Sequence, residues 1–332
     1  MAEWLNLLLR WAHLITGIAW IGSSFYFMWL DSSLEAPPPS KKDVEGELWM
    51  VHSGGFYLVE RKLIEPGSMP KTLHWFKYEA LFTLITGFLL LNLVYYFSGG
   101  AFLLDPSVSN ISHGTGVALG LGVLIVSWIV YDLIWQSKLA LEKNAIALTA
   151  SLALACGAAY VLCHYLSGRA AFIHLGAMFG TIMVVNVWMR ILPSQQKMID
   201  ATKEGRKPDY TLSAKAKRRS VHNSYMTFPV LFMMISNHYA NVTSGPNNWI
   251  HLLLLVVLGI AVRHVALSKT MQGRWAAGIA SVISLGVLVT MTAPPSQAAN
   301  VGAAAVSFAE VRKIFDTRCV ACHSPTPTIT EL

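Results

Sequence analysis

A C-x-x-C-H motif lies near the C-terminal end of the sequence, at Cys319, Cys322 and His323. This spacing is the attachment signature of c-type haem: each thiol adds to a vinyl group of the porphyrin, and the adjacent histidine binds the iron. A chance pair of cysteines or a small zinc site are the alternatives, but zinc takes four ligands and the tail adds only Glu331. The motif therefore predicts redox chemistry. Because c-type haem is attached outside the cytoplasm, the motif also predicts which side of a membrane this segment occupies.

Histidines within apolar segments form a second set of candidates. An ionisable group at membrane depth indicates a functional site. Two facing imidazoles would bind the iron of a b-type haem, and three would suit copper or another metal. The alternative is hydrogen bonding between helices without a cofactor. The candidate metal ligands are His13, His113, His174 and His238.

Polar and aromatic residues at the other ends of these segments form a third set. Proton-transfer groups, amides and aromatic faces together suit a planar polar ring that is stacked and hydrogen-bonded. An interfacial aromatic belt with loop charges is the alternative. The candidate catalytic residues are His222, Glu79 and Lys77, and the candidate substrate-binding residues are His52, Tyr57, Trp75 and Asn223.

The elements that must position these residues are membrane helices. The chain is 54% hydrophobic and 13% charged, with 11 Trp and a mean hydropathy of +0.48, unlike a soluble domain. Apolar stretches long enough to cross a bilayer recur along it. We predict an all-α, polytopic membrane bundle of about eight spans, near residues 4–30, 78–98, 114–135, 144–167, 170–192, 224–242, 248–267 and 275–293.

Loop charges set the predicted orientation. With the N-terminus outside, the loops at 31–77, 136–143, 190–223 and 263–274 fall inside, and they carry 20 of the 25 Lys and Arg. This distribution follows the positive-inside rule and explains the net charge of +7 through anionic lipid, without nucleic acid. An even number of spans puts the C-terminus outside too, where haem is attached. We therefore expect a multi-pass protein of the bacterial inner membrane with a periplasmic C-terminus.

Domain organisation follows from these segments. We predict a membrane domain over 1–293, a small-residue linker over 294–306, and the start of a cytochrome c-like segment over 307–332. Ser307 and Glu310 form a predicted capping box for a short helix before the haem motif.

Four sequence blocks resemble a known family. RWAHLITGIAWIGSSFYF, HSGGFYLVERK, LHWFKYEALFTLITGF and VHNSYMTFPVLFMMISNHY are together similar to the bacterial membrane-bound urate hydroxylases. Those proteins join an eight-span urate oxidase N-terminal domain to a C-terminal cytochrome c. The resemblance implies oxidation of urate to 5-hydroxyisourate in purine catabolism, with electrons passed through cytochrome c to the respiratory chain instead of to oxygen.

One departure from the family concerns haem c. The tail after His323 is SPTPTITEL, which holds no Met to serve as a distal ligand and no core to bury a porphyrin. We therefore expect a truncated cytochrome segment in which haem c is absent or five-coordinate.

Two function classes remain from the sequence. In the first, urate enters at the inner side and electrons cross to a haem b, or another metal, among the outer histidines; an outer substrate site near Arg10 is its variant. In the second, the chain is a haem- or copper-binding membrane protein without urate chemistry, similar to protoporphyrinogen oxidases or copper-resistance proteins. A transporter is disfavoured because no internal repeat is evident.

Overall fold

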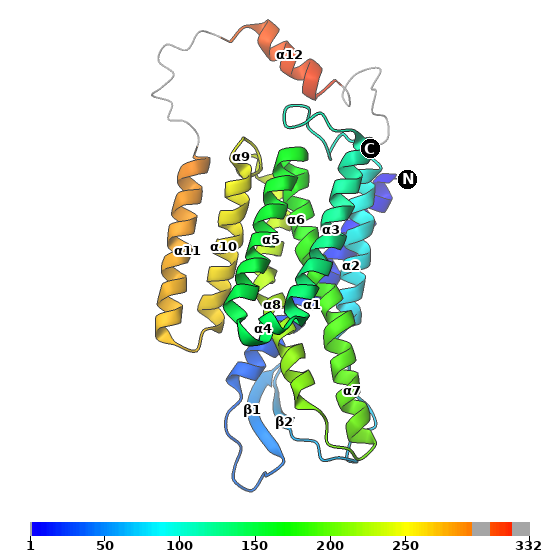
Figure 1. Ribbon diagram of the computed structural model, residues 1–332, viewed down its shortest axis with the longest axis vertical. Coiled ribbons are helices and arrows are strands. Elements are labelled where there is room, and N and C mark those ends of the chain that lie inside the picture. Colours follow the sequence, from blue (N-terminus) through cyan, green and yellow to red (C-terminus); the bar gives the residue numbers. More distant parts are fainter. Residues whose placement is uncertain (1, 294–305, 321–332) are drawn as a thin grey trace. The chain divides into compact units, whose positions relative to one another are not determined.

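The computed structural model describes residues 2–293 and 306–320 and is predominantly helical (Figure 1). The elements of the first half are α1 (Ala2–Ser33), β1 (Val44–His52), β2 (Gly55–Lys62), α2 (Tyr78–Leu91), η1 (Asn92–Tyr96), α3 (His113–Gln136), α4 (Lys138–Glu142) and α5 (Asn144–Tyr165). Those of the second half are α6 (Gly168–Asn186), η2 (Val187–Ile191), α7 (Leu192–Lys203), α8 (Tyr210–Ile235), η3 (Ser236–His238), α9 (Ala240–Thr243), α10 (Asn248–Leu267), α11 (Met271–Thr292) and α12 (Phe308–Arg318).

Helices cover all eight segments that the sequence predicts to span a membrane. In the part of the chain that the structure describes, seven helices are long and apolar enough to cross a bilayer. The remaining predicted span, 224–242, corresponds to the second half of α8 together with η3 and α9. Helix α8 is not apolar enough to be counted as a membrane span, because its first half carries a run of cations that ends at Arg219. The eighth span and the side of each terminus stay predictions.

The described residues divide into two compact units. The first unit is built from residues of 1–11, 86–182 and 228–332, and the second from residues 12–85 and 183–227. The division passes through α1, α2, α6 and α8, so each of these helices contributes one end to each unit.

The core of the first unit is centred on α6. Phe172, Leu175 and Met178 of this helix are completely or almost completely buried, as are Leu162 of α5 and Met233 of α8. Helices α10 and α11 run side by side as an antiparallel pair in the same unit (Figure 1). Aliphatic side chains of α11 are largely exposed, as expected of a helix that faces lipid.

Two helices contain a π-helical turn, η1 after α2 and η2 between α6 and α7. In a π-helical turn the backbone bonds reach one residue further than in an α-helix, and such turns are frequent at functional sites. Both turns carry aromatic side chains, Tyr95 and Tyr96 in η1 and Trp188 in η2.

One β-hairpin lies within the predominantly helical fold. The sequence predicts an inner loop over residues 31–77, and within that segment β1 and β2 pair as an antiparallel hairpin. The turn residues Ser53 and Gly54 have φ of 51° and 77°, the left-handed conformation that a two-residue hairpin turn requires. Trp49 pairs with Leu58 across the strands, so β-forming side chains support the pairing on both sides of that turn.

Ion pairs attach this hairpin to its own unit. Lys41 contacts Glu47 and Glu60 at 2.6 and 2.7 Å, and Arg61 contacts Asp31, the last acidic residue of α1, at 2.8 Å. Hydrogen bonds from the Lys41 ammonium group to the carboxylates of Glu47 and Glu60 raise the pKa of Lys41. A two-stranded hairpin is marginal alone, so contacts of this kind hold it in place.

The short helix before the haem motif is confirmed as α12. Ser307 caps it, and Glu310 completes the predicted capping box, which lowers the pKa of the Glu310 carboxyl group. The predicted linker at 294–306 lies outside the described residues except for Val306.

Candidate functional site

Lys77 stands at the centre of the first candidate site. Its Nζ lies 5.2 Å from the ring centroid of Trp75, 5.3 Å from that of Tyr78 and 5.9 Å from that of Trp188. An ammonium group within about 6 Å of an aromatic face is attracted by the quadrupole of the ring. Trp75 and Tyr78 are neighbours of Lys77 in sequence, whereas Trp188 comes from the π-helical turn η2. The three rings therefore fix the position of one positive charge.

A cleft of about 210 Å³ opens beside this charge. It is smaller than the roughly 300–1,000 Å³ of pockets for drug-sized ligands, so it suits a small planar molecule. We call it the Lys77 cleft, and it is lined by Trp75, Lys77, Trp188, Leu192, Pro193 and Gln196. The sequence predicted Trp75 and Lys77 as site residues and missed the side formed by η2 and α7.

A chain of buried amides lies in the same unit. Asn223 of α8 donates to the Met183 carbonyl oxygen at 2.8 Å, and Asn186 donates to Asn223 Oδ1 at 3.0 Å. Arg219 donates to Asn186 Oδ1 at 3.4 Å. All three side chains are buried. The predicted substrate-binding residue Asn223 is thus held within a network that fastens α8 to the end of α6.

His222 and Glu79 are the predicted proton-transfer groups of this unit. His222 lies before the apolar half of α8; burial lowers its pKa to about 4, and Arg219 and Arg218 add to the shift, so the imidazole is neutral at physiological pH. Glu79 lies in the first turn of α2, and its Oε2 atom is buried with no hydrogen-bond partner among the described residues. A neutral imidazole and a carboxylate oxygen are both able to accept a proton.

The hairpin carries the remaining two predicted substrate residues. His52 ends β1 and Tyr57 lies in β2; both are exposed. Tyr57 pairs with Met50 across the strands. The Lys77 cleft is lined by neither residue, so the structure leaves them near the hairpin tip and groups Trp75 with Lys77.

A second polar site, in the first unit, surrounds η1. Tyr96 donates from its hydroxyl group to His174 Nε2 at 3.0 Å, and His113 donates from Nε2 to the Tyr96 carbonyl oxygen at 2.9 Å. Asn237 donates to the Tyr95 hydroxyl oxygen at 3.1 Å. We call Tyr95, Tyr96, His113, His174 and Asn237 the tyrosine–histidine cluster.

Close packing fills this cluster. His174 is fully buried, and its Nδ1 donates to the Ala170 carbonyl oxygen at 2.7 Å, so both ring nitrogens are engaged. A Cβ placed on Gly120 of α3 would lie 2.6 Å from the Tyr96 hydroxyl oxygen and 2.8 Å from His174 Nε2. No room for a metal remains at that nitrogen in this arrangement.

Of the two other predicted ligands, His13 is placed by a backbone contact and His238 is exposed. His13 of α1 donates from Nδ1 to the Thr83 carbonyl oxygen at 3.1 Å, within the second unit. His238 is exposed in η3, next to Asn237. Over residues 2–293 and 306–320, no group of three or more His, Cys, Asp or Glu side chains is arranged to hold a metal ion. As placed, His174 does not fit axial ligation of iron, and a haem b or another metal in the membrane half stays a prediction.

Comparison with known proteins identifies the family. A family model described as urate oxidase N-terminal matches residues 1–293. The chain belongs to the urate oxidase N-terminal family. Neither a curated protein nor a solved structure gave a significant match. Membership in this family makes the chain a urate-related oxidoreductase of predominantly helical fold.

The matched region contains both sites of this family member, and the haem motif follows it. Cys319 is the residue directly after α12 and carries a free thiol. Cys322 and His323 lie outside the described residues, so haem attachment stays a prediction for this member of the urate oxidase N-terminal family.

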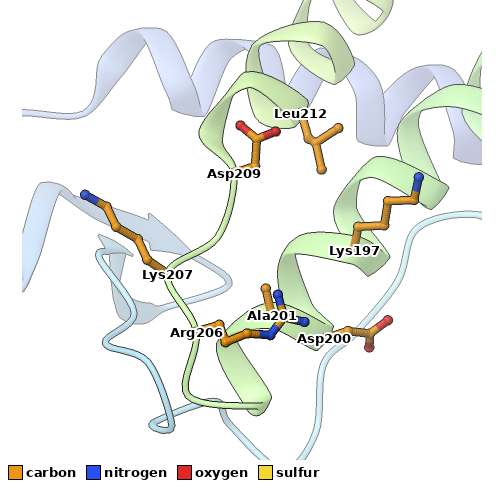
Figure 2. Close-up of a pocket in the computed structure, with 7 residues that line it drawn as sticks. All are labelled: Lys197, Asp200, Ala201, Arg206, Lys207, Asp209 and Leu212. Atoms are coloured by element: carbon orange, nitrogen blue, oxygen red, sulfur yellow. The ribbon is translucent and has the colours of Figure 1, made fainter.

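A larger cleft of about 350 Å³ is formed by the end of α7, the start of α8 and the loop between them. Figure 2 shows its charged side chains, with Lys197 and Lys207 directed away from each other. Its cations are matched by carboxylates: Arg206 pairs with Glu204, and Asp200 and Asp209 also line the cleft. The walls carry mixed charge with little aromatic surface. In a family linked to urate, the Lys77 cleft is the better candidate for a planar ring.

Proposed function

We propose that this protein oxidises urate to 5-hydroxyisourate and passes the electrons to a c-type cytochrome and the respiratory chain, as a step of purine catabolism. The family supplies the substrate. The Lys77 cleft is the observation that carries the assignment, because it combines a fixed positive charge with aromatic faces. Urate is a planar bicyclic ring that is anionic at neutral pH, so both features favour its binding.

The reaction balances with water as the oxygen source. Urate and one water give 5-hydroxyisourate, two protons and two electrons. The protein must therefore hold the anion, accept protons and release electrons to a one-electron acceptor. Oxygen is not needed in this scheme.

Residues of the second unit supply the first two tasks. Lys77 would hold the urate anion and Trp75 would stack on its ring. Glu79, whose buried oxygen is free among the described residues, and the neutral His222 would accept protons. Asn223 would act as a positioning residue, since its amide is engaged by Asn186 and Met183 and it adjoins His222 on α8. His52 and Tyr57, exposed on the hairpin, would meet the substrate before it enters.

Electron release involves the C-terminal segment. Cys319 and Cys322 would attach a haem c and His323 would bind its iron, and the group would supply a one-electron acceptor when bound. We place this segment in the periplasm of a bacterial inner-membrane protein, and a separate cytochrome c is the partner expected beyond it.

Urate-dependent reduction of added cytochrome c by membranes that contain the full chain tests this proposal. We expect anaerobic formation of 5-hydroxyisourate with two cytochromes reduced per urate. Lys77→Met keeps most of the side-chain stem and removes the charge, and it should raise KM for urate at least about tenfold. Lys138→Met, an exposed lysine outside the cleft, is the matched control and should leave KM unchanged. Urate consumption that requires oxygen, or none at all, would contradict the proposal.

A further inference from the structure

The Lys77 cleft has a side that the proposed catalytic and substrate-binding residues do not include. Trp188, Leu192, Pro193 and Gln196 come from η2 and the first turns of α7. Trp188 contributes an aromatic face to Lys77 as well as lining the cleft. This side therefore contacts whatever the charge of Lys77 attracts.

The positive charge of Lys77 in the cleft favours binding of an anion. Among the described residues, no carboxylate forms an ion pair with Lys77, and the groups that hold its ammonium are the three rings. Aromatic faces hold the ammonium group without neutralising it. A ligand that carries its own negative charge next to a flat surface would complement this arrangement.

Gln196 offers a hydrogen-bond acceptor whose direction is fixed. Its Nε2 donates to Asp200 Oδ1 at 2.7 Å. An ionised carboxylate only accepts hydrogen bonds, so the amide nitrogen must face Asp200 and the carbonyl oxygen is left for another donor. Gln196 is exposed and lines the cleft, which makes that oxygen available to a ring N–H of a ligand.

Trp188 offers a donor. Its indole Nε1 is buried with no hydrogen-bond partner among the described residues. Buried polar groups in native proteins are almost always paired, and Trp188 lines the cleft, so a partner that arrives with the ligand would satisfy this N–H. A carbonyl oxygen of the ligand is the complementary group.

We propose that Trp188 and Gln196 are specificity-determining residues that select an anionic oxopurine, with Trp188 donating to a ring carbonyl and Gln196 accepting from a ring N–H. This inference rests on the proposed function, because the family links the site to urate. It adds the residues that distinguish urate from other purines. Hypoxanthine has less negative charge and fewer carbonyl groups, and N-methylated urates lack a donor, so both classes should bind more weakly.

The test measures urate binding and urate turnover separately, on the full chain in detergent. Equilibrium dialysis with labelled urate gives Kd, and cytochrome c reduction gives KM and kcat. Gln196→Met and Trp188→Phe should each raise Kd and KM about five- to tenfold, with kcat changed less than about twofold, because one ground-state hydrogen bond is lost. Gln196→Met should also reduce the preference for urate over the methylated urate whose missing N–H faced Gln196.

Two controls match these variants. Gln195→Met changes the neighbouring exposed glutamine, which does not line the cleft. Trp128→Phe removes an indole N–H that is likewise buried and unpaired among the described residues, but in α3. Both should leave Kd for urate unchanged.

The outcomes separate this inference from the proposed function. Turnover of urate by the wild type with equal Kd values in Gln196→Met and Gln195→Met would overturn the specificity assignment alone. Absence of turnover together with urate binding that weakens in Trp188→Phe and Gln196→Met would overturn the proposed function and support the binding site. Equal binding of urate and hypoxanthine by the wild type would also overturn the assignment.

Discussion

The tyrosine–histidine cluster and the Lys77 cleft both place polar groups beside a π-helical turn, yet one is closed and the other open. In the cluster, His174 has both nitrogens engaged and Gly120 packs against the Tyr96–His174 contact. In the cleft, the charge of Lys77 lies against three aromatic faces of the described residues, next to a volume of about 210 Å³. A polar group whose hydrogen bonds are all made within the protein stabilises the fold, whereas a polar group beside a cleft is able to bind a ligand.

This difference teaches which residue types signal chemistry in an apolar bundle. Histidines attract attention in sequence, but here His13, His113, His174 and His251 each donate a ring N–H to a backbone carbonyl. Where water is scarce, an imidazole is a convenient partner for a carbonyl group. Lys77, with its aromatic neighbours, is the less conspicuous but more accessible group.

The largest expected effect concerns the amide network near the cleft. Asn223→Leu removes the acceptor of the Asn186 amide N–H and a donor to the Met183 carbonyl oxygen, and each lost buried hydrogen bond costs about 1–3 kcal/mol. We expect the free energy of unfolding to fall by about 3–5 kcal/mol, measured by thermal unfolding in detergent. Asn144→Leu, at an exposed position, should change it by less than about 0.5 kcal/mol. Equal effects would show that the network contributes little to stability.

A smaller effect tests whether the tyrosine–histidine cluster is closed. Gly120→Ala would force the new Cβ against Tyr96 and His174, and we expect a loss of about 1–3 kcal/mol in the free energy of unfolding. Gly122→Ala, two residues along α3, meets nothing within 4 Å and should instead be neutral or stabilising by up to about 1 kcal/mol. If Gly120→Ala is tolerated as well as Gly122→Ala, the cluster has room for a cofactor and the contrast with the cleft fails.

The pH dependence of stability gives a third comparison. The pKa of His222 is about 4 in the folded protein and about 6.5 in the unfolded chain, so the unfolded state takes up a proton first as the pH falls. Stability from this group is present above about pH 6.5 and is lost towards pH 4. Between about pH 7 and pH 5 we expect the wild type to lose about 1–2 kcal/mol more than His222→Gln, measured by chemical unfolding at each pH. Parallel curves for the two proteins would contradict a buried, neutral His222.

The smallest effect concerns the hairpin. Lys41→Met removes the cation that bridges Glu47 and Glu60, and ion pairs at the protein surface contribute little. We expect a slight loss of hairpin protection in hydrogen exchange, which shrinks in high salt because screening weakens the wild-type contacts. A large change in KM for urate would show that the hairpin contributes more to binding than the cleft does.

Local signals in the sequence predicted local structure well. The capping box of Ser307 and Glu310 is confirmed, and the predicted spans coincide with helices. The sequence predicts a loop at the H-S-G-G run, whereas the structure forms a hairpin turn there, because the pairing of Trp49 with Leu58 across the strands has no local signal in the sequence.

Long-range contacts set the limit of prediction for the site. Trp75 and Lys77 are two residues apart, so their association is visible in the sequence. Trp188 and Gln196 join them from more than a hundred residues away, through a π-helical turn that has no composition signal of its own. For the same reason, one sequence does not reveal that His174 bonds to Tyr96 and packs against Gly120.

The π-helical turn η2 also has a consequence for how this chain tolerates insertions and deletions. A π-helical turn is an α-helix with one residue added, and the wider turn absorbs that residue, so the helix on either side keeps its facing. Deleting one residue within 187–191 would therefore restore an α-helix and leave α6 and α7 facing much as before. The side chains inside the turn would change their positions instead, so Trp188 would shift relative to the rest of the Lys77 cleft. A single codon thus separates two helices of equal regularity, of which only the longer one presents the site.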